Sequence, residues 1–434
     1  MPQTPCRSDA GCFASRLDYV AAWFLKAGEY VQGSNACIAF VATNSITQGE
    51  QVAQLWPALF QKWNLEIAFA HRTFAWGSDA RGKAHVHVVI VGLTRRSEQP
   101  AEKRLFDYDH VNGDPHETRH LALSPYLFDA SNLRNRHLVV ERERRSLRGK
   151  PTICVGSKPV DGGHYIMDAD ERRSFLTTEP DAAPIIRPFI GGREHINGGE
   201  RWILYPEGAS SETLRNLPAV RRRIADVRRH RESEGGPLGR QLSAVPMSYH
   251  VTVVPTQPFL ALAEVSSERR TYVPIGWLEP PVIPSNKLLV IPNASLSLFA
   301  QMTSAMHMAW LSYIGGRMKS DFSYSPGLVY NTFPWPELSE PDTTRLNALA
   351  QAILDARSNH EGATLADLYD PDTMPGDLRK AHHTLDLAVD RLYRKAPFEN
   401  DRQRVEHLFT LYEGMTAGLL STPSKVRRTP TSAA

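Results

Sequence analysis

The sequence is poor in cysteine, has no long apolar run and carries no large excess of one charge. Four cysteines among 434 residues are too few and too scattered for a disulfide scaffold or a paired zinc motif. The longest apolar run, residues 84–93, is far shorter than the roughly 20 residues that span a membrane. Residues 1–16 lack the apolar core of a signal peptide. We therefore expect a cytoplasmic protein without a membrane segment.

The bulk composition is that of a globular protein with several domains. Hydrophobic residues make up 41% and charged residues 22% of the chain, which is ordinary for such proteins. The length favours about three domains. The formal net charge is only +3, so the charge sum indicates no partner. The arginines are clustered, however, and local clusters matter more than the sum.

The clearest periodic pattern lies in the first hundred residues. Apolar residues follow helical spacing in 17–31 and 51–63, and they form short runs typical of buried strands in 37–43, 65–70 and 84–93. Strand, helix and strand with so short a crossover predict a parallel pair in a doubly wound α/β sheet. The turn before the last strand is too short for a helix, which predicts an antiparallel hairpin at the sheet edge.

A strongly basic helix is predicted at 214–230. The helix carries Arg221, Arg222, Arg223, Arg228, Arg229 and Arg231. One face would hold Arg221, Arg228 and, more loosely, Arg231, with Arg222 and Arg229 beside it. Such a cluster suits contacts with DNA phosphates. The alternative is a solvated helix face, but Asp226 and Glu232 are the only nearby acids that would neutralise it.

Residues 315–325, GGRMKSDFSYS, alternate between polar and apolar side chains. On an extended ribbon one side would carry Arg317, Lys319, Asp321 and Ser323. Polar side chains in a row on a strand suit the reading of base edges, Lys or Arg to guanine and Asp to cytosine. The alternative is an exposed polar strand face without a ligand.

Six motifs occur in the order that one known family shows. They are TNSITQGEQV (43–52), AHRTF (70–74), SSERRTYVPIG (266–276), IPNASLSLF (291–299), MHMAW (306–310) and YNTFPWP (330–336). The set resembles the adenine-specific DNA methyltransferases of type IIL and type IIG restriction–modification systems and their relatives in phage exclusion. The resemblance covers about residues 17–419.

The resemblance implies an architecture. It implies the C-terminal half of a class I methyltransferase sheet, then an α+β target-recognition domain and a helical C-terminal region. The expected boundaries are 1–16 for an unpatterned start, 17–95 for the methyltransferase half, 96–184 for a connector, 185–336 for target recognition, 337–420 for the helical region and 421–434 for a disordered tail.

The resemblance also implies a reaction, the transfer of a methyl group from S-adenosylmethionine to the exocyclic amino group of adenine in double-stranded DNA. The family's glycine cofactor loop and Asn-Pro-Pro-aromatic motif are absent from this sequence. We therefore expect the chain to bind DNA, to be inactive alone and to act with an upstream-encoded N-terminal methyltransferase half. The alternatives are a DNA-binding specificity subunit without a catalytic role and a gene remnant.

Site residues follow from the same resemblance. The target adenine must be flipped out of the duplex and stacked. Phe74 matches an aromatic of the family's base pocket, with Trp76 as the alternative, and the competing interpretation is a core aromatic. Lys319 and Asp321 fall where the family's paired base-reading residues are expected. Two further residues of the SSERR motif, Arg269 and Arg270, are candidate phosphate ligands.

Polar residues also follow the first predicted strand. Thr43 and Asn44 lie at the strand end where α/β sheets bind ligands, so they are candidates for the cofactor pocket. Capping of the next helix is an equal alternative. His71, His85 and His87 have no cysteine or carboxylate at metal-ligand spacing, so we expect no metal.

Overall fold

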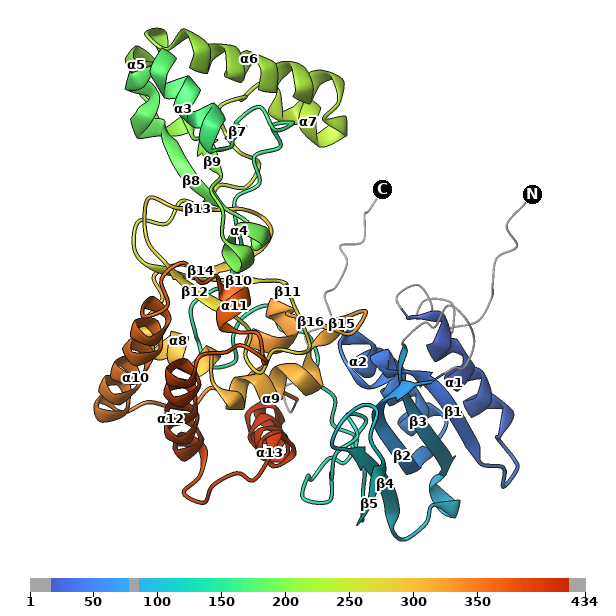
Figure 1. Cartoon of the computed structure of the whole chain (residues 1–434). Coiled ribbons are helices and arrows are strands. Elements are labelled where there is room, and N and C mark those ends of the chain that lie inside the picture. Colours follow the sequence, from blue (N-terminus) through green and yellow to red (C-terminus); the bar gives the residue numbers. More distant parts are fainter. Residues whose placement is uncertain (1–16, 78–85, 421–434) are drawn as a thin grey trace, which may run out of the picture.

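The computed structural model describes residues 17–77 and 86–420 of the chain. The expected start and tail, and also His85, lie outside the described residues. Among the residues described, no helix is long and apolar enough to cross a membrane. Figure 1 shows a β-sheet part at one end, a lobe rich in helices at the other end, and long helices beside the centre.

The first part of the chain is a sheet with flanking helices. Its elements are α1 (Tyr19–Tyr30), β1 (Ile38–Thr43), η2 (Asn44–Thr47), α2 (Glu50–Pro57), η3 (Ala58–Lys62), β2 (Leu65–Trp76), β3 (Val86–Arg95), η4 (Arg96–Glu98), β4 (Lys103–Tyr108) and β5 (Pro115–His120). The strand order is β1-β3-β2-β4-β5. The helix predicted at 51–63 is shorter than expected, because the α-helix ends at Pro57 and the chain continues as the π-helix η3.

The predicted hairpin of β2 and β3 is present, but it lies inside the sheet and not at its edge, and the predicted parallel pair of neighbouring strands is wrong. β3 runs antiparallel to both β1 and β2 and lies between them. β1 and β2 therefore point the same way without touching, because the short connection folds β3 back into the space beside β1. The segment expected to be a connector adds two strands, β4 parallel to β2 and β5 antiparallel to β4. β5 reads PHETRH, so no apolar period announces it.

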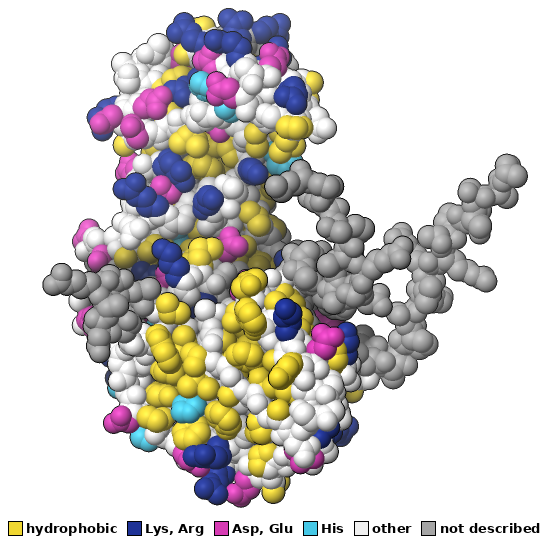
Figure 2. Space-filling view, turned by 90° about the vertical axis from the view of Figure 1, so that its right-hand side faces the viewer, with side chains coloured by type: hydrophobic (Ala, Val, Ile, Leu, Met, Phe, Trp, Pro, Cys, Tyr) yellow, Lys and Arg dark blue, Asp and Glu magenta, His cyan; other side chains and the backbone are white. Residues whose placement is uncertain are grey.

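Strand β1 differs from the expectation that both of its faces are buried. Ala39 and Val41 are exposed, and Val41 retains 47% of its accessible surface. Among the described residues β1 pairs with β3 alone, so its other edge is open. Tyr19 and Trp23 of α1 are exposed as well. Figure 2 shows hydrophobic side chains gathered over the lower half of the face on which α1 and β1 lie.

The second part carries a lobe rich in helices and then a set of short strands. Strand β6 (Cys154–Val155) precedes the lobe and pairs with a later strand. The lobe contains β7 (Ile166–Met167), α3 (Ala169–Thr178), η5 (Pro180–Ile185), β8 (Ile186–Ile190), α4 (Gly192–Asn197), β9 (Trp202–Leu204), η6 (Pro206–Gly208), α5 (Ser211–Arg215), α6 (Pro218–Ser233) and α7 (Gly236–Leu242). The strands and helices that follow are β10 (Phe259–Ala263), β11 (Val265–Ser266), β12 (Ile275–Leu278), β13 (Ile283–Pro284), β14 (Leu288–Ile291), α8 (Leu296–Met302), α9 (Ala305–Ile314), β15 (Gly316–Met318), β16 (Asp321–Ser323) and η7 (Pro326–Tyr330).

Three small sheets organise this part. Their strand orders are β12-β10-β14-β6, β11-β16-β15 and β13-β8-β9-β7. Residues 158–254, here called the distal lobe, pack around a hydrophobic cluster of their own that includes Tyr165, Phe189 and Val227. Figure 1 places the distal lobe at the end of the molecule away from the first sheet.

The long apolar helix predicted at 295–315 is broken. α8 ends at Met302 and α9 begins at Ala305, after Ser304. The side chain of Ser304 accepts a hydrogen bond from the amide of His307, and the Asp386 carboxylate accepts one from the amide of Ala305 at 2.7 Å. A serine cap and a carboxylate from another part of the chain thus start a second helix inside one apolar run.

The third part consists of α10 (Glu340–Ser358), α11 (Leu365–Leu368), α12 (Gly376–Tyr393) and α13 (Asp401–Leu420). α13 packs against α9, where Trp310 and Phe409 bring their rings within 5.2 Å. One continuous hydrophobic core runs from Ala21 of α1 to Tyr412 of α13. The first sheet, α9 and the last helices therefore form one packed body, with the distal lobe beside it.

Candidate DNA interface

An aromatic cluster lies on β2 and its neighbour β4. The ring of Phe74 stacks on Tyr108 with 5.1 Å between centroids, and the ring of His71 stacks on Phe106 at 4.2 Å. His71 Nδ1 and the hydroxyl of Tyr108 share a hydrogen bond of 2.8 Å. Trp76 lies 6.3 Å from Phe74 between centroids and is 47% exposed. Phe74 is half-buried, so Trp76 is the more open of the two candidate stacking rings.

Thr43 and Asn44 lie directly after β1, as expected. Thr43 Oγ1 and Ser45 Oγ share a hydrogen bond of 2.9 Å, and the side chain of Asn44 is nearly buried. They do not cap helix α2. Its N-cap is Gly49, whose φ of 68° lies in the left-handed region that glycine adopts without strain. Thr43 stands instead at the N-cap position of the short 3-10 helix η2, without a capping hydrogen bond from its side chain, so the capping alternative is wrong for the helix predicted at 51–63.

The segment predicted as one extended ribbon is a tight hairpin. β15 and β16 are antiparallel, with Arg317 opposite Phe322 and Met318 opposite Asp321. Lys319 lies in the turn with a φ of 60° and is exposed. Asp321 and Ser323 share one face of β16, whereas Arg317 lies on the other face. The prediction that all four polar residues share a side is wrong, because the turn reverses the chain between Lys319 and Asp321.

Arg317 is a support of the hairpin. Its guanidinium lies over the ring of Phe322 at 3.9 Å, and its Nη1 donates to the carbonyl of Ser320 at 3.2 Å. Burial lowers the pKa of Arg317 to about 10. A buried guanidinium stacked within its own hairpin is poorly placed to reach a base.

The SSERR motif lies beside this hairpin. The Asp321 carboxylate accepts a hydrogen bond from the amide of Glu268 at 3.2 Å. Arg269 forms an ion pair with Asp372, and burial lowers the pKa of Arg270. In the described part of the chain, both arginines thus already have local roles, as an ion-pair partner and a partly buried cation.

The basic helix is α6, and its arginines divide into two kinds. Arg221, Arg222, Arg228 and Arg229 are exposed, with Arg229 paired to Asp226. Arg231 is fully buried and donates to the carbonyls of five residues: Pro159, Val160, Leu242, Val245 and Ser248. The placement of Arg231 on the exposed basic face is therefore wrong. Figure 2 shows basic side chains gathered at the end of the molecule that α6 occupies.

The predicted residues therefore fall into two separate groups. His87 of β3 pairs with Ala75, which stands between Phe74 and Trp76, and His87 Nδ1 lies 3.4 Å from the carboxylate of Glu268. Through Glu268 and Asp321, the β15–β16 hairpin is linked to the strand that bears the candidate stacking rings. Figure 1 places α6 at the far end of the distal lobe, away from this junction.

Three models of one family match the chain in succession. They are the MmeI DNA-methyltransferase domain over residues 7–107, the MmeI target recognition domain over 134–337 and the MmeI C-terminal domain over 339–420. The chain belongs to the MmeI family. This confirms the resemblance and the expected succession of methyltransferase sheet, target recognition domain and helical C-terminal region.

Two known proteins are similar to most of this chain. DNA methyltransferase A of Bacillus subtilis (strain 168) is 39% identical over 404 residues, which cover 92% of this chain and 44% of that protein. The solved structure of the type IIL restriction–modification enzyme MmeI in complex with DNA superposes with a TM-score of 0.79 at 39% identity, over 92% of this chain and 53% of that one. This chain therefore spans about half the length of the relatives it matches.

Sequence reasoning missed several residues at or near the contact between the first sheet and the β15–β16 hairpin. Tyr108 and Asp107 lie on β4, inside the segment expected to be a connector. Glu268 stands beside Arg269 in the SSERR motif, which was interpreted through its arginines alone. Arg72 follows His71 in the AHRTF motif and pairs with Asp107 at 3.1 Å. The motif itself was a signal for Arg72, but no local pattern indicates its partner.

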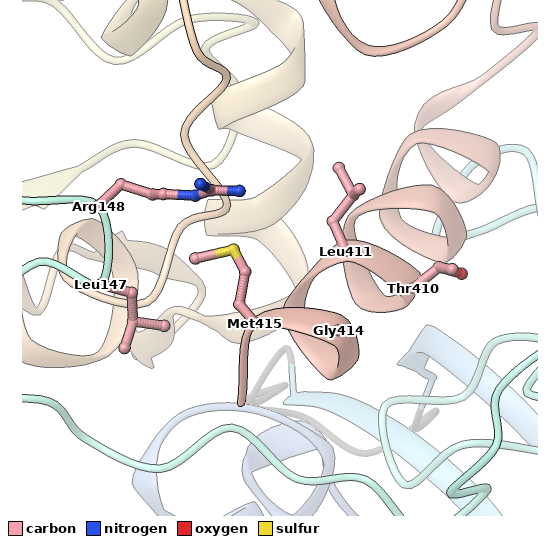
Figure 3. A pocket seen from close by; sticks show the side chains of 6 residues that line it. All are labelled: Leu147, Arg148, Thr410, Leu411, Gly414 and Met415. Atoms are coloured by element: carbon pink, nitrogen blue, oxygen red, sulfur yellow. The ribbon is translucent and has the colours of Figure 1, made fainter. Parts of the chain in front are cut away.

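Two further observations concern metal binding and a pocket. Within the described residues, no group of three or more His, Cys, Asp or Glu side chains could hold a metal ion. A pocket of about 460 Å³ lies between α13 and residues 147–148, and Figure 3 shows Met415 extending towards Arg148 in it. None of the predicted site residues lines that pocket.

Proposed function

We propose that this chain supplies the target-recognition domain and one side of the base pocket of a site-specific DNA adenine methyltransferase. The methyl donor would be S-adenosylmethionine, and the substrate double-stranded DNA in the cytoplasm. The observation that carries the proposal is the link from hairpin to aromatic strand, which runs through Asp321, Glu268, His87 and Ala75. It joins a candidate reader of bases to candidate stacking rings.

The base-reading role belongs to the turn and to one face of the β15–β16 hairpin, here called the recognition hairpin. Lys319 at the turn is free to reach into a groove, and Asp321 and Ser323 present acceptors on one strand face. A cation that contacts guanine and a carboxylate that contacts cytosine are each worth about 1–3 kcal/mol of discrimination. Arg317 supports these residues from the other face of the hairpin.

A flipped adenine would meet the rings of β2. Extrusion of a base costs a few kcal/mol, and stacking on an aromatic side chain returns about 1–3 kcal/mol. Trp76 and Phe74 are the candidate rings, and Tyr108 holds Phe74 from behind at 5.1 Å. Both rings stand on a segment of β2 that pairs with β3, and the amide of Ala75 between them donates to the carbonyl of Val111 at 2.7 Å, so the backbone that carries them is held before DNA arrives.

The arginines of α6 would bind DNA phosphates at a different part of the duplex. Arg221, Arg222 and Arg228 are exposed on α6, at the outer end of the distal lobe. Phosphate contacts set affinity and position without reading sequence. Arg229, Arg269 and Arg270 are weaker candidates, because the first two have acidic partners and the third is partly buried.

The described residues do not by themselves make a site for S-adenosylmethionine. At the end of β1 the chain offers the hydroxyl of Thr43 and the nearly buried side chain of Asn44. A glycine loop for the cofactor is absent from the sequence. These two residues could complete one wall of a pocket whose main part comes from elsewhere, so the chain alone would not transfer methyl groups.

The open side of β1 is the surface on which the missing half would dock. An apolar strand with an unpaired edge and an exposed face is normally covered. Val41, Tyr19 and Trp23 present such a surface, and the matched relatives are about twice as long as this chain. The occupant would be the preceding strands and helices of the methyltransferase domain, on a separate polypeptide or a preceding segment.

A second function keeps the DNA-binding role without the chemistry. A specificity subunit would use the same hairpin and the same arginines to direct another protein. The target-recognition match over 134–337 supports DNA binding under either proposal. The two differ in whether the β2 rings meet a reacting base.

Methyl transfer in a reconstituted pair tests the proposal. The chain is co-expressed with a methyltransferase half that carries the glycine loop and the Asn-Pro-Pro-aromatic motif, and labelled methyl groups on adenine are measured. We expect transfer by the pair and none by the chain alone. A folded pair that binds DNA with sequence preference but transfers nothing would favour the specificity subunit.

Val41→Lys tests the docking surface in the same assay. A lysine on the open strand should block addition of a neighbour and reduce methyl transfer by the pair, while improving the solubility of the chain alone. Val155→Lys is the matched control, because Val155 is also a strand valine and is 48% exposed. Equal transfer by both variants would place the partner elsewhere.

A further inference from the structure

Arg72 stands where the three parts of the chain meet. It lies on β2 in the register irregularity between His71 and Phe74, two residues before a candidate stacking ring. Its side chain is about one-quarter exposed. An irregularity of this kind turns a side chain out of the regular alternation, which lets Arg72 reach beyond its own sheet.

The group of side chains around Arg72 draws on all three parts, the third through Asp107. Its Nη1 donates to both carboxylate oxygens of Asp107 on β4, each at 3.1 Å. Its guanidinium carbon lies 4.6 Å from the ring centroid of Tyr313 on α9. The same Asp107 accepts a hydrogen bond from Arg402 on α13. One carboxylate and one aromatic ring therefore join the methyltransferase sheet, the target-recognition domain and the C-terminal helices.

The charges make this group hard to rearrange. Burial opposes ionisation of Asp107, but Arg72 and Arg402 outweigh it and hold the pKa of the carboxyl below its usual value. Loss of the carboxylate would leave two guanidinium groups facing each other without a counter-charge. Tyr313 is 6% exposed and packs edge-on against Phe128, so its ring has little freedom to move.

Helix α9 transmits this position to the recognition hairpin. Tyr313 is followed by Ile314, which ends α9, and β15 begins at Gly316. The carbonyl of Ile314 accepts a hydrogen bond from the amide of Gly49 at 3.2 Å, and a Cβ on Gly49 would lie 3.2 Å from the Cα of Gly316. The start of the hairpin is thus held against the loop that precedes α2.

We propose that Arg72 is a positioning residue that locks the recognition hairpin in a fixed orientation towards the base-stacking strand. The inference rests on the proposed function of the hairpin and of β2. Domains within one chain move relative to each other unless a specific interface holds them. A site that reads one base and modifies another needs its groups fixed within about 0.5 Å. The Arg72–Asp107–Tyr313–Arg402 group, here called the junction clamp, supplies such an interface.

The position of the hairpin can be measured without DNA. Spin labels are placed on Cys37, which is exposed at the start of β1, and on Met318→Cys in the hairpin, in the full chain with Cys6, Cys12 and Cys154 replaced by serine. Pulsed electron paramagnetic resonance then gives the distribution of label distances. Arg72→Lys keeps the charge but loses the paired hydrogen bonds and the flat stacking surface. We expect the distribution of label distances in Arg72→Lys to be about twice as wide as in the chain that keeps Arg72.

Arg104→Lys is the matched control. Arg104 also stands in this sheet, pairs with both oxygens of Glu117 at 3.0 and 2.8 Å, and lies over an aromatic ring, that of Phe106, at 4.9 Å. Its contacts stay within the first part of the chain. Arg104→Lys should leave the distribution unchanged, and a distribution that is equally narrow in Arg72→Lys overturns the clamp.

Asp107→Asn gives the same test from the partner's side. It preserves the shape of the side chain, so it covers the case in which Arg72→Lys does not fold. Selection of bound duplexes from a randomised pool adds a functional measurement, in which both clamp variants should lose about tenfold of the preference at the base pair that the hairpin reads. If Arg72→Lys widens the distribution of label distances but even the unchanged chain shows no sequence preference, the proposed function is contradicted and the clamp is still supported.

Discussion

Lys319 combines a strained backbone with a free side chain at the tip of the recognition hairpin. Its φ of 60° is unfavourable for a residue with a Cβ, and its side chain is exposed. A strained residue in a turn is a candidate for function, since a glycine would fit the turn better. In Lys319 the backbone and side-chain effects can be separated by experiment.

Lys319→Ala and Lys319→Gly should both abolish or alter the preference at one base pair. Alanine keeps the strain of the turn, while glycine removes about 1–2 kcal/mol of it and loses about 0.5–1 kcal/mol to chain entropy. Stability should therefore change by no more than about 1.5 kcal/mol in either variant. Duplex selection and thermal unfolding measure the two effects. Met318→Ala, at an exposed neighbour, should keep the preference, and a preference kept by both Lys319 variants would refute the base-reading role.

At the scale of an element, α6 shows why a cluster of like charges has to be sorted by burial. A helix presents its residues to all sides, so a run of arginines cannot all face a partner. Arg231 faces inward and ties α6 to the segments before and after it, whereas Arg228 faces outward. Arg231 therefore stabilises the distal lobe, and Arg228 is free to contact phosphates.

Arg231→Met should destabilise the distal lobe by about 3–5 kcal/mol, because the carbonyls that Arg231 binds would lose their buried donor. Hydrogen exchange in α6 and α7 measures the loss. Arg228→Gln should leave that exchange unchanged and reduce the dependence of DNA affinity on salt by about one phosphate contact. Unaltered salt dependence in Arg228→Gln would remove α6 from the DNA interface.

At the scale of the whole molecule, three buried histidines tie folding to pH. Burial is the main cause that lowers the pKa of His195 to about 4 and those of His307 and His382 to about 3. His307 and His382 each share a hydrogen bond of 2.8 Å with a tyrosine hydroxyl. His307 lies in α9 and His382 in α12 of the packed body, and His195 of α4 forms a hydrogen bond with the carbonyl of Pro274 at 3.2 Å.

Stability should therefore fall as the pH drops below about 6.5. The unfolded chain then binds protons that the folded chain excludes, so each histidine costs about 2 kcal/mol between pH 6.5 and pH 5. Asp386 acts in the opposite direction, because burial raises its pKa to about 6 and the folded state then holds a proton more tightly. Denaturant titrations at several pH values measure the sum. His307→Gln should flatten the dependence, whereas His116→Gln, at an exposed histidine, should not.

The first sheet shows how far periodicity reaches. Helical and strand patterns between residues 17 and 95 predicted the main elements, and the short turn predicted the hairpin. The strand order did not follow, because β3 could pair on either side of β2 as far as the sequence shows. β5 was missed because its side chains face water and leave no apolar period.

Motifs and periods lie in short stretches of the chain, so they were enough to predict the family, the order of the parts and the residue types at the candidate site. Which of those residues meet depends on the tertiary structure. Because of the turn at Lys319, Arg317 lies on the other face of the hairpin. Arg231 is buried and does not lie on the basic surface. The ion pair of Arg402 with Asp107 joins residues 295 positions apart. Contacts of that kind depend on how the packed layers fit together, which no local pattern records.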